Sequence, residues 1–326
     1  MTRTALITGG TGLLGREVVK EFNEAGWKAI GTGVTRAKPP SIVKLDLLEE
    51  GGIERVLDEV KPDVVVHCAA DRFPDSVAQN PSRARALNAS APTKLASLTA
   101  ARGTFLLYIS TDYVFSGRPG EAPYKPTSTR DPPNTYGETK AEGEDGVLRA
   151  GSDSGNDKIL GVVLRVPILY GSGERSESAV GVLVDQVEKA QDIRPDRGEA
   201  TIKMDDYAQR YPTNTEDVAR VCREICELYT SRNTKGKGGE LPRILHFSSE
   251  DRMTKYQMCE VFAEILGAPM GGLERYRPDE EEAQKEGIKR PYDCHLDTTE
   301  LRELGVNVST MDFTGWWRRE LRAFRH

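Results

Sequence analysis

Short apolar runs alternate with amphipathic stretches along the first 170 residues of the chain. The apolar runs predict strands at residues 4–8, 28–32, 63–68, 105–110 and 159–166. Amphipathic spacing predicts helices between them, at residues 12–25, 52–60, 82–102 and 136–149. Runs without a polar residue are typical of strands that helices cover on both faces. This alternation of strand and helix predicts an α/β fold built on a doubly wound parallel sheet.

The alternation weakens after residue 170, where helical patterns dominate. They predict helices at residues 215–229, 254–266 and 298–304, and a strand at 243–247. We therefore expect two domains, with the sheet in residues 1–170 and a smaller, mostly helical C-terminal lobe in residues 171–326. Some segments of the lobe are expected to fold back onto the sheet. Stretches rich in Gly, Ser, Asn or Pro predict loops at residues 116–134, 150–158 and 231–240.

The charge balance and the apolar content exclude several classes of protein. The chain carries 45 basic and 51 acidic residues, so it lacks the basic excess that is typical of a nucleic-acid surface. No segment approaches the roughly 20 apolar residues of a membrane helix, and the first residues hold no signal-peptide core. We therefore expect a soluble protein of the cytosol, with the nucleus as a second location, and neither nucleic acid nor membrane as a partner.

The five cysteines form no recognisable framework, which is typical of a reducing compartment. Cys222 and Cys226 are four residues apart and would share one helix face, an arrangement that two metal ligands could use. No histidine or further cysteine stands at zinc-finger spacing, so two small core residues is the better interpretation and no metal is expected.

A glycine-rich turn joins the first predicted strand to the first predicted helix. Its Gly-x-x-Gly-x-x-Gly pattern is a variant of the dinucleotide-binding motif of Rossmann-type sheets. Gly9 allows the tight turn, Gly12 lets the backbone approach a pyrophosphate, and Gly15 lets the helix pack on the strand. The residues expected to bind the phosphates are Thr8, Gly9, Thr11, Gly12, Leu13, Leu14 and Gly15.

The end of the second predicted strand indicates which nicotinamide cofactor binds. An NAD site places an acidic residue there to hold the ribose 2′-hydroxyl. Here the segment carries Thr35, Arg36 and Lys38, and no acid. Arg36 can stack on adenine and pair with a 2′-phosphate, and Arg16 at the start of the first helix could add a second cation. We therefore expect NADP(H); the alternative is a set of solvated surface charges.

Further candidate cofactor contacts lie near the ends of other strands. An Asp-Leu pair can bracket the adenine, small residues allow the cofactor to pass closely, and a strand end can hold the nicotinamide carboxamide through its backbone. The Asp-Leu pair is Asp46 and Leu47, and the small residues are Cys68, Ala69 and Ala70. The strand end that would hold the carboxamide is Pro167, Ile168 and Leu169, and Asn88 is a further candidate.

A strand-end hydroxyl, a tyrosine and a lysine form a candidate catalytic set. Tyr136 and Lys140 are four residues apart at a helix start, so their side chains share a face. Reduction of a carbonyl needs a proton donor, and a neighbouring ammonium would lower the pKa of the phenol and reach the nicotinamide ribose. Thr111 would hold the substrate oxygen. Alone, this spacing describes any surface helix turn, but the upstream motifs favour the catalytic interpretation.

The order of these motifs resembles a known family. Thr-Gly-Gly-Thr-Gly-Leu-Leu-Gly, Ser-Thr-Asp-Tyr-Val-Phe, Tyr-Gly-Glu-Thr-Lys and Arg-Val-Pro-Ile-Leu-Tyr-Gly are similar to motifs of the dTDP-4-dehydrorhamnose reductase branch of the extended short-chain dehydrogenases/reductases. Within that branch, the chain resembles the regulatory β subunits of methionine adenosyltransferase. That closer resemblance rests on motifs such as Gln-Arg-Tyr-Pro-Thr at 209–213 and Arg-Pro-Tyr-Asp-Cys-His-Leu-Asp at 290–297.

The resemblance implies NADP(H) in a cleft between two domains. It also implies a non-catalytic role, in which the protein binds the methionine adenosyltransferase catalytic subunit and tunes S-adenosylmethionine synthesis. The complete Thr-Tyr-Lys set favours a different function, an NADPH-dependent reductase with a nucleotide-sugar substrate. A sensor that binds NADP(H) without turnover is a third hypothesis, so enzymatic activity stays open at this point.

The C-terminal residues 313–326 interleave aromatic and arginine side chains. Such side chains often anchor interfaces, and the resemblance implies a tail that inserts into the catalytic subunit. The sequence therefore predicts that loss of residues 315–326 weakens partner binding and leaves stability and cofactor binding largely unchanged. The alternative is a terminal helix whose Trp316 and Trp317 pack on their own domain.

Overall fold

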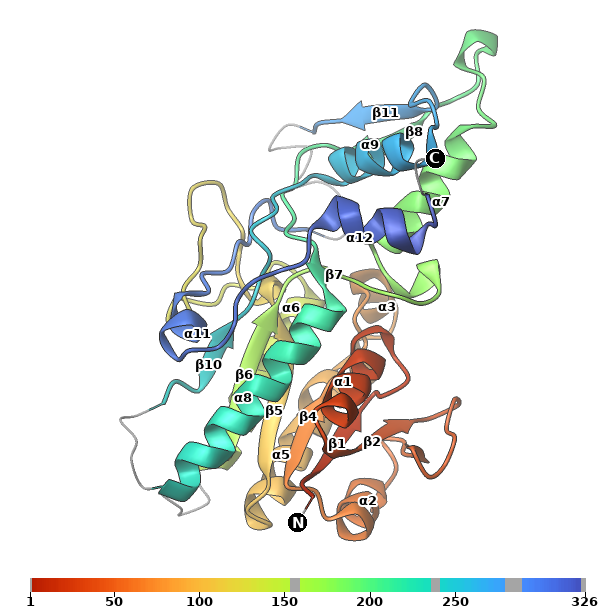
Figure 1. Cartoon of the computed structure of the whole chain (residues 1–326). Helices are drawn as coiled ribbons and strands as arrows, with labels where there is room; N and C mark the ends of the chain where they lie inside the picture. Colours follow the sequence, from red (N-terminus) through yellow and green to blue (C-terminus); the bar gives the residue numbers. More distant parts are fainter. Residues whose placement is uncertain (1, 153–158, 236–240, 279–288, 324–326) are drawn as a thin grey trace.

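Seven parallel strands form the central sheet of the molecule (Figure 1). The computed structural model describes residues 2–152, 159–235, 241–278 and 289–323. The strand order is β10-β6-β5-β4-β1-β2-β3, and all neighbouring pairs are parallel. The strands are β1 Thr4–Thr8, β2 Lys28–Gly33, β3 Ile42–Lys44, β4 Val64–His67, β5 Phe105–Thr111, β6 Gly161–Val166 and β10 Ile244–His246. The prediction of a Rossmann-type, doubly wound parallel sheet is confirmed.

Helices cover both faces of this sheet. Alternate side chains of each strand point to opposite faces of the sheet. Those on one face form an apolar core with α1 and α8, and those on the other face form a core with α2, α5 and α6. The helices of this layer are α1 Leu13–Glu24, α2 Gly52–Val60, α3 Pro74–Gln79, α4 Pro81–Arg85, α5 Ala91–Ala101, α6 Thr135–Ser152 and α8 Thr215–Lys235. Because α8 and β10 come from the second half of the chain, that half contributes a helix and an edge strand to the sheet layer.

A π-helical turn at Ala86–Ser90 interrupts the single helix predicted at 82–102, between α4 and α5. Pro92 has no amide hydrogen, so it cannot donate to the carbonyl of Asn88 four residues earlier. The hydroxyl of the buried Tyr108 on β5 donates to that carbonyl instead, at 3.1 Å. The missing donor explains why the regular helix breaks here.

The remainder of the second half packs around a separate apolar core. The elements around that core are α7 Gly181–Ala190, α9 Lys255–Leu266, α12 Phe313–Glu320 and the paired strands β8 Ile202–Asp205 and β11 Leu273–Tyr276. The other elements of this half are the paired strands β7 Leu169–Tyr170 and β9 Thr213–Asn214, and the helix α11 Thr299–Glu303. The sequence pattern missed α7 and the strands β7, β8, β9 and β11. Each of these strands has only two to four residues, which are too few to show an alternation.

The predicted loops meet different outcomes. Residues 116–134 form a loop with a single bridge at Tyr124, as expected. Residues 150–152 and 231–235 were expected in loops but continue α6 and α8, so those predictions are wrong there. The rest of the two insertions, residues 153–158 and 236–240, lies outside the described residues. In the part of the chain that the structure describes, no helix is long and apolar enough to span a membrane.

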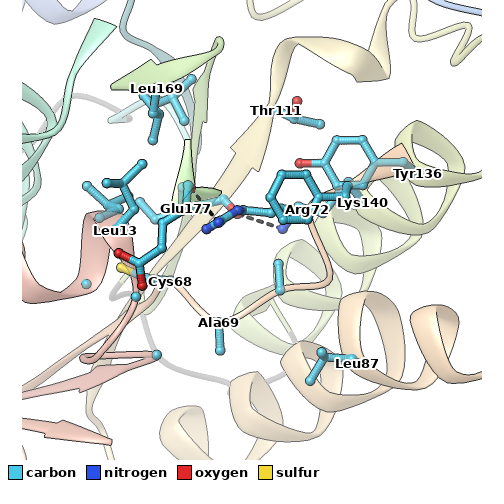
Figure 2. Close-up of a pocket in the computed structure, with 18 of the residues that line it drawn as sticks. Leu13, Cys68, Ala69, Arg72, Leu87, Thr111, Tyr136, Lys140, Leu169 and Glu177 are labelled. Carbon is cyan, nitrogen blue, oxygen red and sulfur yellow. Dashed lines mark hydrogen bonds between the residues drawn. The ribbon is translucent and has the colours of Figure 1, made fainter. Parts of the chain in front are cut away.

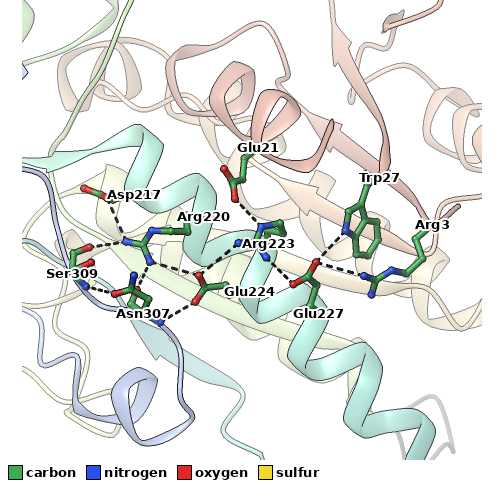
Figure 3. A network of polar contacts seen from close by, with 10 residues as sticks. All are labelled: Arg3, Glu21, Trp27, Asp217, Arg220, Arg223, Glu224, Glu227, Asn307 and Ser309. Carbon is green, nitrogen blue, oxygen red and sulfur yellow. Dashed lines mark hydrogen bonds and ion pairs between the residues drawn. The ribbon is translucent and has the colours of Figure 1, made fainter. Parts of the chain in front are cut away.

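Polar side chains on α8 fasten it to α1 and to the chain that precedes α12 (Figure 3). The Arg223 guanidinium donates to Glu21 of α1 and to Glu227, both at 2.7 Å. Arg220 donates to the carbonyl of Ser309 at 2.6 Å. The contact with Glu21 holds the second half of the chain against the first, and the contact with Ser309 ties α8 to the chain that precedes α12.

The aromatic residues near the C-terminus lie inside the protein. Phe313, Trp316 and Trp317 belong to the core of the lobe, and each is at most 4% exposed. The Trp317 ring lies 5.9 Å from the Tyr170 ring and 4.8 Å from the Phe262 ring, between centroids. The expectation that this segment leaves the protein to reach a partner is wrong, because α12 supplies apolar side chains that fill the lobe. Residues 324–326 of the tail lie outside the described residues.

Candidate functional site

A cavity of about 620 Å³ opens at the carboxyl ends of the central strands. Doubly wound sheets bind their ligands at this edge, where the strand order reverses. The expected site residues that line it are Gly9, Thr11, Gly12, Leu13, Leu14, Gly15, Thr35, Arg36, Asp46, Leu47, Cys68, Ala69, Ala70, Thr111, Tyr136, Lys140, Pro167, Ile168 and Leu169. One cavity thus gathers most of the expected cofactor residues and all three catalytic candidates.

The turn after β1 has the geometry that a phosphate site requires. Gly9 takes a φ of 67°, in the left-handed region, and its carbonyl accepts from the amide of Gly12 at 2.9 Å. A Cβ at Gly15 would lie 2.1 Å from the Gly9 carbonyl oxygen, so only glycine fits there. Gly12 is the N-cap of α1, and the first amides of this helix are therefore available to an anion in the cavity.

Arg36, which the sequence assigned to a 2′-phosphate, pairs with a glutamate from the second half of the chain. Its Nη1 donates to Glu177 Oε1 at 2.9 Å. Arg16, just outside the cavity lining, pairs with the other carboxylate oxygen. Arg72 lines the cavity and donates to the Glu177 backbone carbonyl. Sequence reasoning missed Arg72 and Glu177.

Thr8, Lys38 and Asn88 are expected cofactor residues that do not line the cavity. The Thr8 hydroxyl forms a hydrogen bond with the ring of His67 at 2.8 Å. Lys38 takes part in a backbone bridge next to β3. The Asn88 amide binds both the N–H and the C=O of Asp71, at 2.9 Å each. Thr8 therefore supports the end of β4, and Asn88 supports the connection that follows β4.

The catalytic candidates lie together in the cavity wall (Figure 2). Thr111 ends β5, and Tyr136 and Lys140 stand on the first turns of α6. The Lys140 ammonium donates to the carbonyl of Ile109 at 2.8 Å and lies 4.1 Å from the centre of the Tyr108 ring. Burial lowers the pKa of Lys140 to about 7, although neighbouring anions act in the opposite direction.

Tyr136 keeps its proton in this environment. Burial raises the pKa of the phenol above its ordinary value, and a hydrogen bond with Thr111 offsets only part of the rise. The expectation that Lys140 lowers this pKa is wrong, because the effect of burial dominates and the ammonium is bound to a backbone carbonyl. A protonated phenol beside a threonine hydroxyl is suited to donate a proton to a carbonyl oxygen that becomes an alkoxide.

Two buried charged residues of the cavity wall escaped sequence reasoning. The Thr111 hydroxyl donates to Asp112 at 3.0 Å, and burial raises the pKa of Asp112 to about 7, although Arg210 acts to lower it. Arg210 Nη1 donates to the carbonyl of Pro291 at 3.0 Å, and its Nη2 has no hydrogen-bond partner among the described residues. Asp112 could have been found from its place beside Thr111, whereas Arg210 carries no local signal.

A buried ion pair lies one helical turn beyond Lys140. Arg165 of β6 donates to both carboxylate oxygens of Glu144, at 2.8 and 2.6 Å, and the Ser110 hydroxyl donates at 2.6 Å. The side chains of Arg165 and Glu144 are at most 1% exposed. The spacing of four residues from Tyr136 to Lys140 to Glu144 is a signal that the sequence carried and the prediction overlooked.

The fold and this cavity define a Rossmann-type protein of the extended short-chain dehydrogenase/reductase class. The family model described as RmlD substrate binding domain matches residues 3–324. A solved structure of dTDP-4-dehydrorhamnose reductase from Bacillus anthracis, in complex with NADP, is similar with a TM-score of 0.74 and 20% identity, over 99% of each chain. This likeness shows the shared fold.

Sequence identity to known relatives shows to which part of this family the chain belongs. The chain is 39% identical to methionine adenosyltransferase 2 subunit beta of Danio rerio, over 99% of this chain and 92% of that one. It is 28% identical to dTDP-4-dehydrorhamnose reductase of Mycolicibacterium smegmatis, over 94% of this chain and 81% of that one. The chain therefore belongs to the RmlD substrate binding domain family and, within it, to the methionine adenosyltransferase 2 subunit beta family.

Proposed function

We propose that the protein is an NADP(H)-binding regulatory subunit that binds a methionine adenosyltransferase catalytic subunit and tunes S-adenosylmethionine synthesis. The observation that carries this proposal is the identity of 39% to methionine adenosyltransferase 2 subunit beta over nearly the whole chain. In this proposal residues 1–170 supply most of the cofactor contacts, and residues 171–326 supply the lobe that meets the partner.

The residues of the cavity fit NADP(H). The glycine turn keeps open a space that a Cβ would fill, and the N-terminus of α1 would receive the pyrophosphate. Arg36 and Arg16 would pair with the 2′-phosphate. Asp46 and Leu47 would bracket the adenine, and Lys140 would reach the nicotinamide ribose. When bound, the reduced cofactor supplies a hydride.

One observation favours a second function, an NADPH-dependent reductase of a nucleotide keto-sugar. Thr111, Tyr136 and Lys140 line the same cavity, and Tyr136 is protonated there. In that role Tyr136 would donate a proton to the substrate oxygen, and Thr111 would hold that oxygen. Lys140 would place positive charge beside the reacting groups.

Reconstitution tests the regulatory function. The purified protein is mixed with the methionine adenosyltransferase catalytic subunit of the same source, and complex formation and S-adenosylmethionine synthesis are measured with and without NADPH. We expect a stable complex whose kinetic constants differ from those of the catalytic subunit alone. The absence of a complex, together with NADPH oxidation in the presence of a dTDP-keto-sugar, would support the reductase instead.

Tyr136→Phe separates the two functions. In a reductase, loss of the phenolic proton should lower kcat at least about 100-fold. NADPH binding should stay within about twofold, because the phenol acts on the substrate and not on the phosphates. In a regulatory subunit, the variant should bind and tune the catalytic subunit as the wild type does. Turnover assays and titration calorimetry measure both; a variant that no longer tunes its partner contradicts a purely regulatory role.

A further inference from the structure

A glutamate from the second half of the chain extends into the cavity. Glu177 ends a short 3-10 turn in the connection between β7 and α7. Figure 2 shows its side chain between Leu13 and Arg72. The carboxylate accepts from Arg36 Nη1 at 2.9 Å and pairs with Arg16, while the backbone carbonyl accepts from Arg72. Glu177 thus occupies the arginines that the cofactor phosphate would use.

The three arginines come from three separate segments of the first half. Arg16 lies in the first turns of α1, Arg36 follows β2, and Arg72 follows β4. Arg16 and Arg36 pair with the Glu177 carboxylate and Arg72 donates to its backbone carbonyl, so three positive charges surround a residue that carries one negative charge. The side chain of Glu177 is only 16% exposed, which reduces screening by water and salt. An anion with more charge and more acceptor oxygens than a carboxylate would satisfy the three cations better.

The connection that carries Glu177 is fastened to the lobe on both sides of this residue. The Ser178 hydroxyl donates to the carbonyl of Leu169 at 2.9 Å. Arg175 pairs with Asp185 of α7 at 2.9 Å. Burial acts to raise the pKa of Glu177, but hydrogen bonds from the two arginines outweigh it and hold the pKa below its ordinary value. The fold therefore keeps a carboxylate anion at this place at neutral pH.

We propose that Glu177 is an internal counter-anion that competes with the 2′-phosphate of NADP(H) for Arg16 and Arg36. The proposal rests on the proposed NADP(H) site. A phosphate monoester carries close to two negative charges and three strong acceptor oxygens. It can therefore displace the single carboxylate of Glu177, but it first has to break the ion pairs that Glu177 makes with Arg16 and Arg36. NAD(H) has a hydroxyl at this position and leaves those pairs in place. Glu177 therefore weakens NADP(H) binding selectively.

Isothermal titration calorimetry of NADPH and NADH tests this role in the full-length protein. Glu177→Gln keeps the size of the side chain and one acceptor oxygen, and removes the charge. We expect it to bind NADPH at least about tenfold more tightly, the effect of one charge-assisted hydrogen bond. NADH binding should change less than about threefold, since the hydroxyl does not compete. Glu174→Gln is the matched control, because Glu174 is exposed on the same connection and should leave both affinities unchanged.

An unchanged ratio of NADPH to NADH affinity in Glu177→Gln overturns the proposal. Weaker NADPH binding also overturns it, because Glu177 would then help to hold the cofactor. If the wild type binds neither dinucleotide, the variant decides. NADPH binding that emerges only in Glu177→Gln supports competition at this site, and its absence there contradicts both the proposal and the NADP(H) site. Thermal melting checks that each variant is folded. Glu177→Ala, which removes both oxygens, repeats the comparison if Glu177→Gln is unstable.

Discussion

Burial, more than any neighbouring charge, sets the ionisation of the side chains around the cavity. It lowers the pKa of Lys140 to about 7, raises that of Asp112 to about 7, and raises that of Tyr136. In each case the neutral form is favoured, as desolvation requires. Two groups that titrate near neutral pH beside a protonated phenol form a site suited to proton transfer.

His246 on β10 is also buried, and it predicts a pH dependence of stability. Its Nε2 lies 3.2 Å from Arg165 Nη1, and its Nδ1 lies 3.1 Å from the Tyr124 carbonyl. Because a guanidinium only donates, Nε2 accepts and Nδ1 carries the proton. Burial, and to a lesser degree Arg165, lowers the pKa of His246 to about 3, below the unfolded value near 6.5. As the pH falls, His246 therefore binds a proton in the unfolded chain but stays neutral in the folded protein.

This difference should lower the free energy of unfolding by about 1.4 kcal/mol between pH 7.5 and 5.5. His246→Gln cannot take up the proton, so its free energy of unfolding should fall by about 1.4 kcal/mol less over that range. Urea denaturation at the two pH values measures the difference. Only the pH dependence is compared, so any cost of the substitution itself cancels. Equal pH dependence in the two proteins would show that the fold does not lower the pKa of this histidine.

Which residues line the cavity could be predicted where local sequence places them. The glycine turn and the ends of apolar runs come together because parallel strands end at one edge of the sheet. Glu177 could not be predicted in this way, since it meets Arg16 and Arg36 across 161 and 141 residues. The absence of an acid after β2 correctly drew attention to Arg36, but no local pattern shows that an acid arrives there from the second half of the chain.

Among the helices, α6 depends most on a buried charge. Glu144 accepts from Arg165 on β6 through both oxygens, and from Arg130 at 3.1 Å. Removing these charges from water costs about as much as their attraction returns, so the pair adds little net stability. It does fix how α6 lies on β6. Tyr136 and Lys140 stand on the same face of the helix, so the pair also positions them opposite Thr111.

Breaking this pair should be costly. Glu144→Gln should lower the free energy of unfolding by about 3–5 kcal/mol, because it leaves the buried Arg165 without its anion. Glu142→Gln is the matched control on the same helix; Glu142 pairs with Arg85 at the surface, and its loss should cost no more than about 1 kcal/mol. Urea denaturation compares the two variants. Equal, small costs would show that Arg165 does not depend on Glu144.

Several of the strands that the sequence pattern missed are short and hold polar side chains. All seven residues of β5 are buried, and the first five of them, Phe105 to Ile109, form an unbroken apolar run in the sequence. By contrast β3 has three residues and β8 four, with polar side chains among them. Pairing with a neighbouring strand stabilises such short segments, and this tertiary effect leaves no period in the sequence.

At the scale of the whole molecule, the two halves of the chain interleave. The second half adds α8 and β10 to the sheet layer, and its Glu177 and Arg210 line the cavity of the first half. The hydrophobic period predicted the sheet and most of its helices, because those elements are long and locally encoded. It could not predict how the lobe covers the cavity, which depends on contacts between residues far apart in the sequence.

The packing of α12 predicts what its loss would do to both halves. Trp317→Ala should lower the free energy of unfolding by about 3–5 kcal/mol, because it empties a site between the Tyr170 and Phe262 rings. Arg319→Ala, on the exposed side of the same helix, should change it by less than about 0.5 kcal/mol. Urea denaturation compares these two variants.

Deletion of residues 315–326 removes both tryptophans, so it should destabilise the lobe. Because the Tyr170 ring packs on α12 and β7 continues into the connection that carries Glu177, the deletion should also loosen the competing carboxylate and change NADPH affinity. Calorimetric melting and NADPH titration measure the two effects. A deletion that leaves both unchanged but no longer binds the catalytic subunit would instead place the partner surface on this tail.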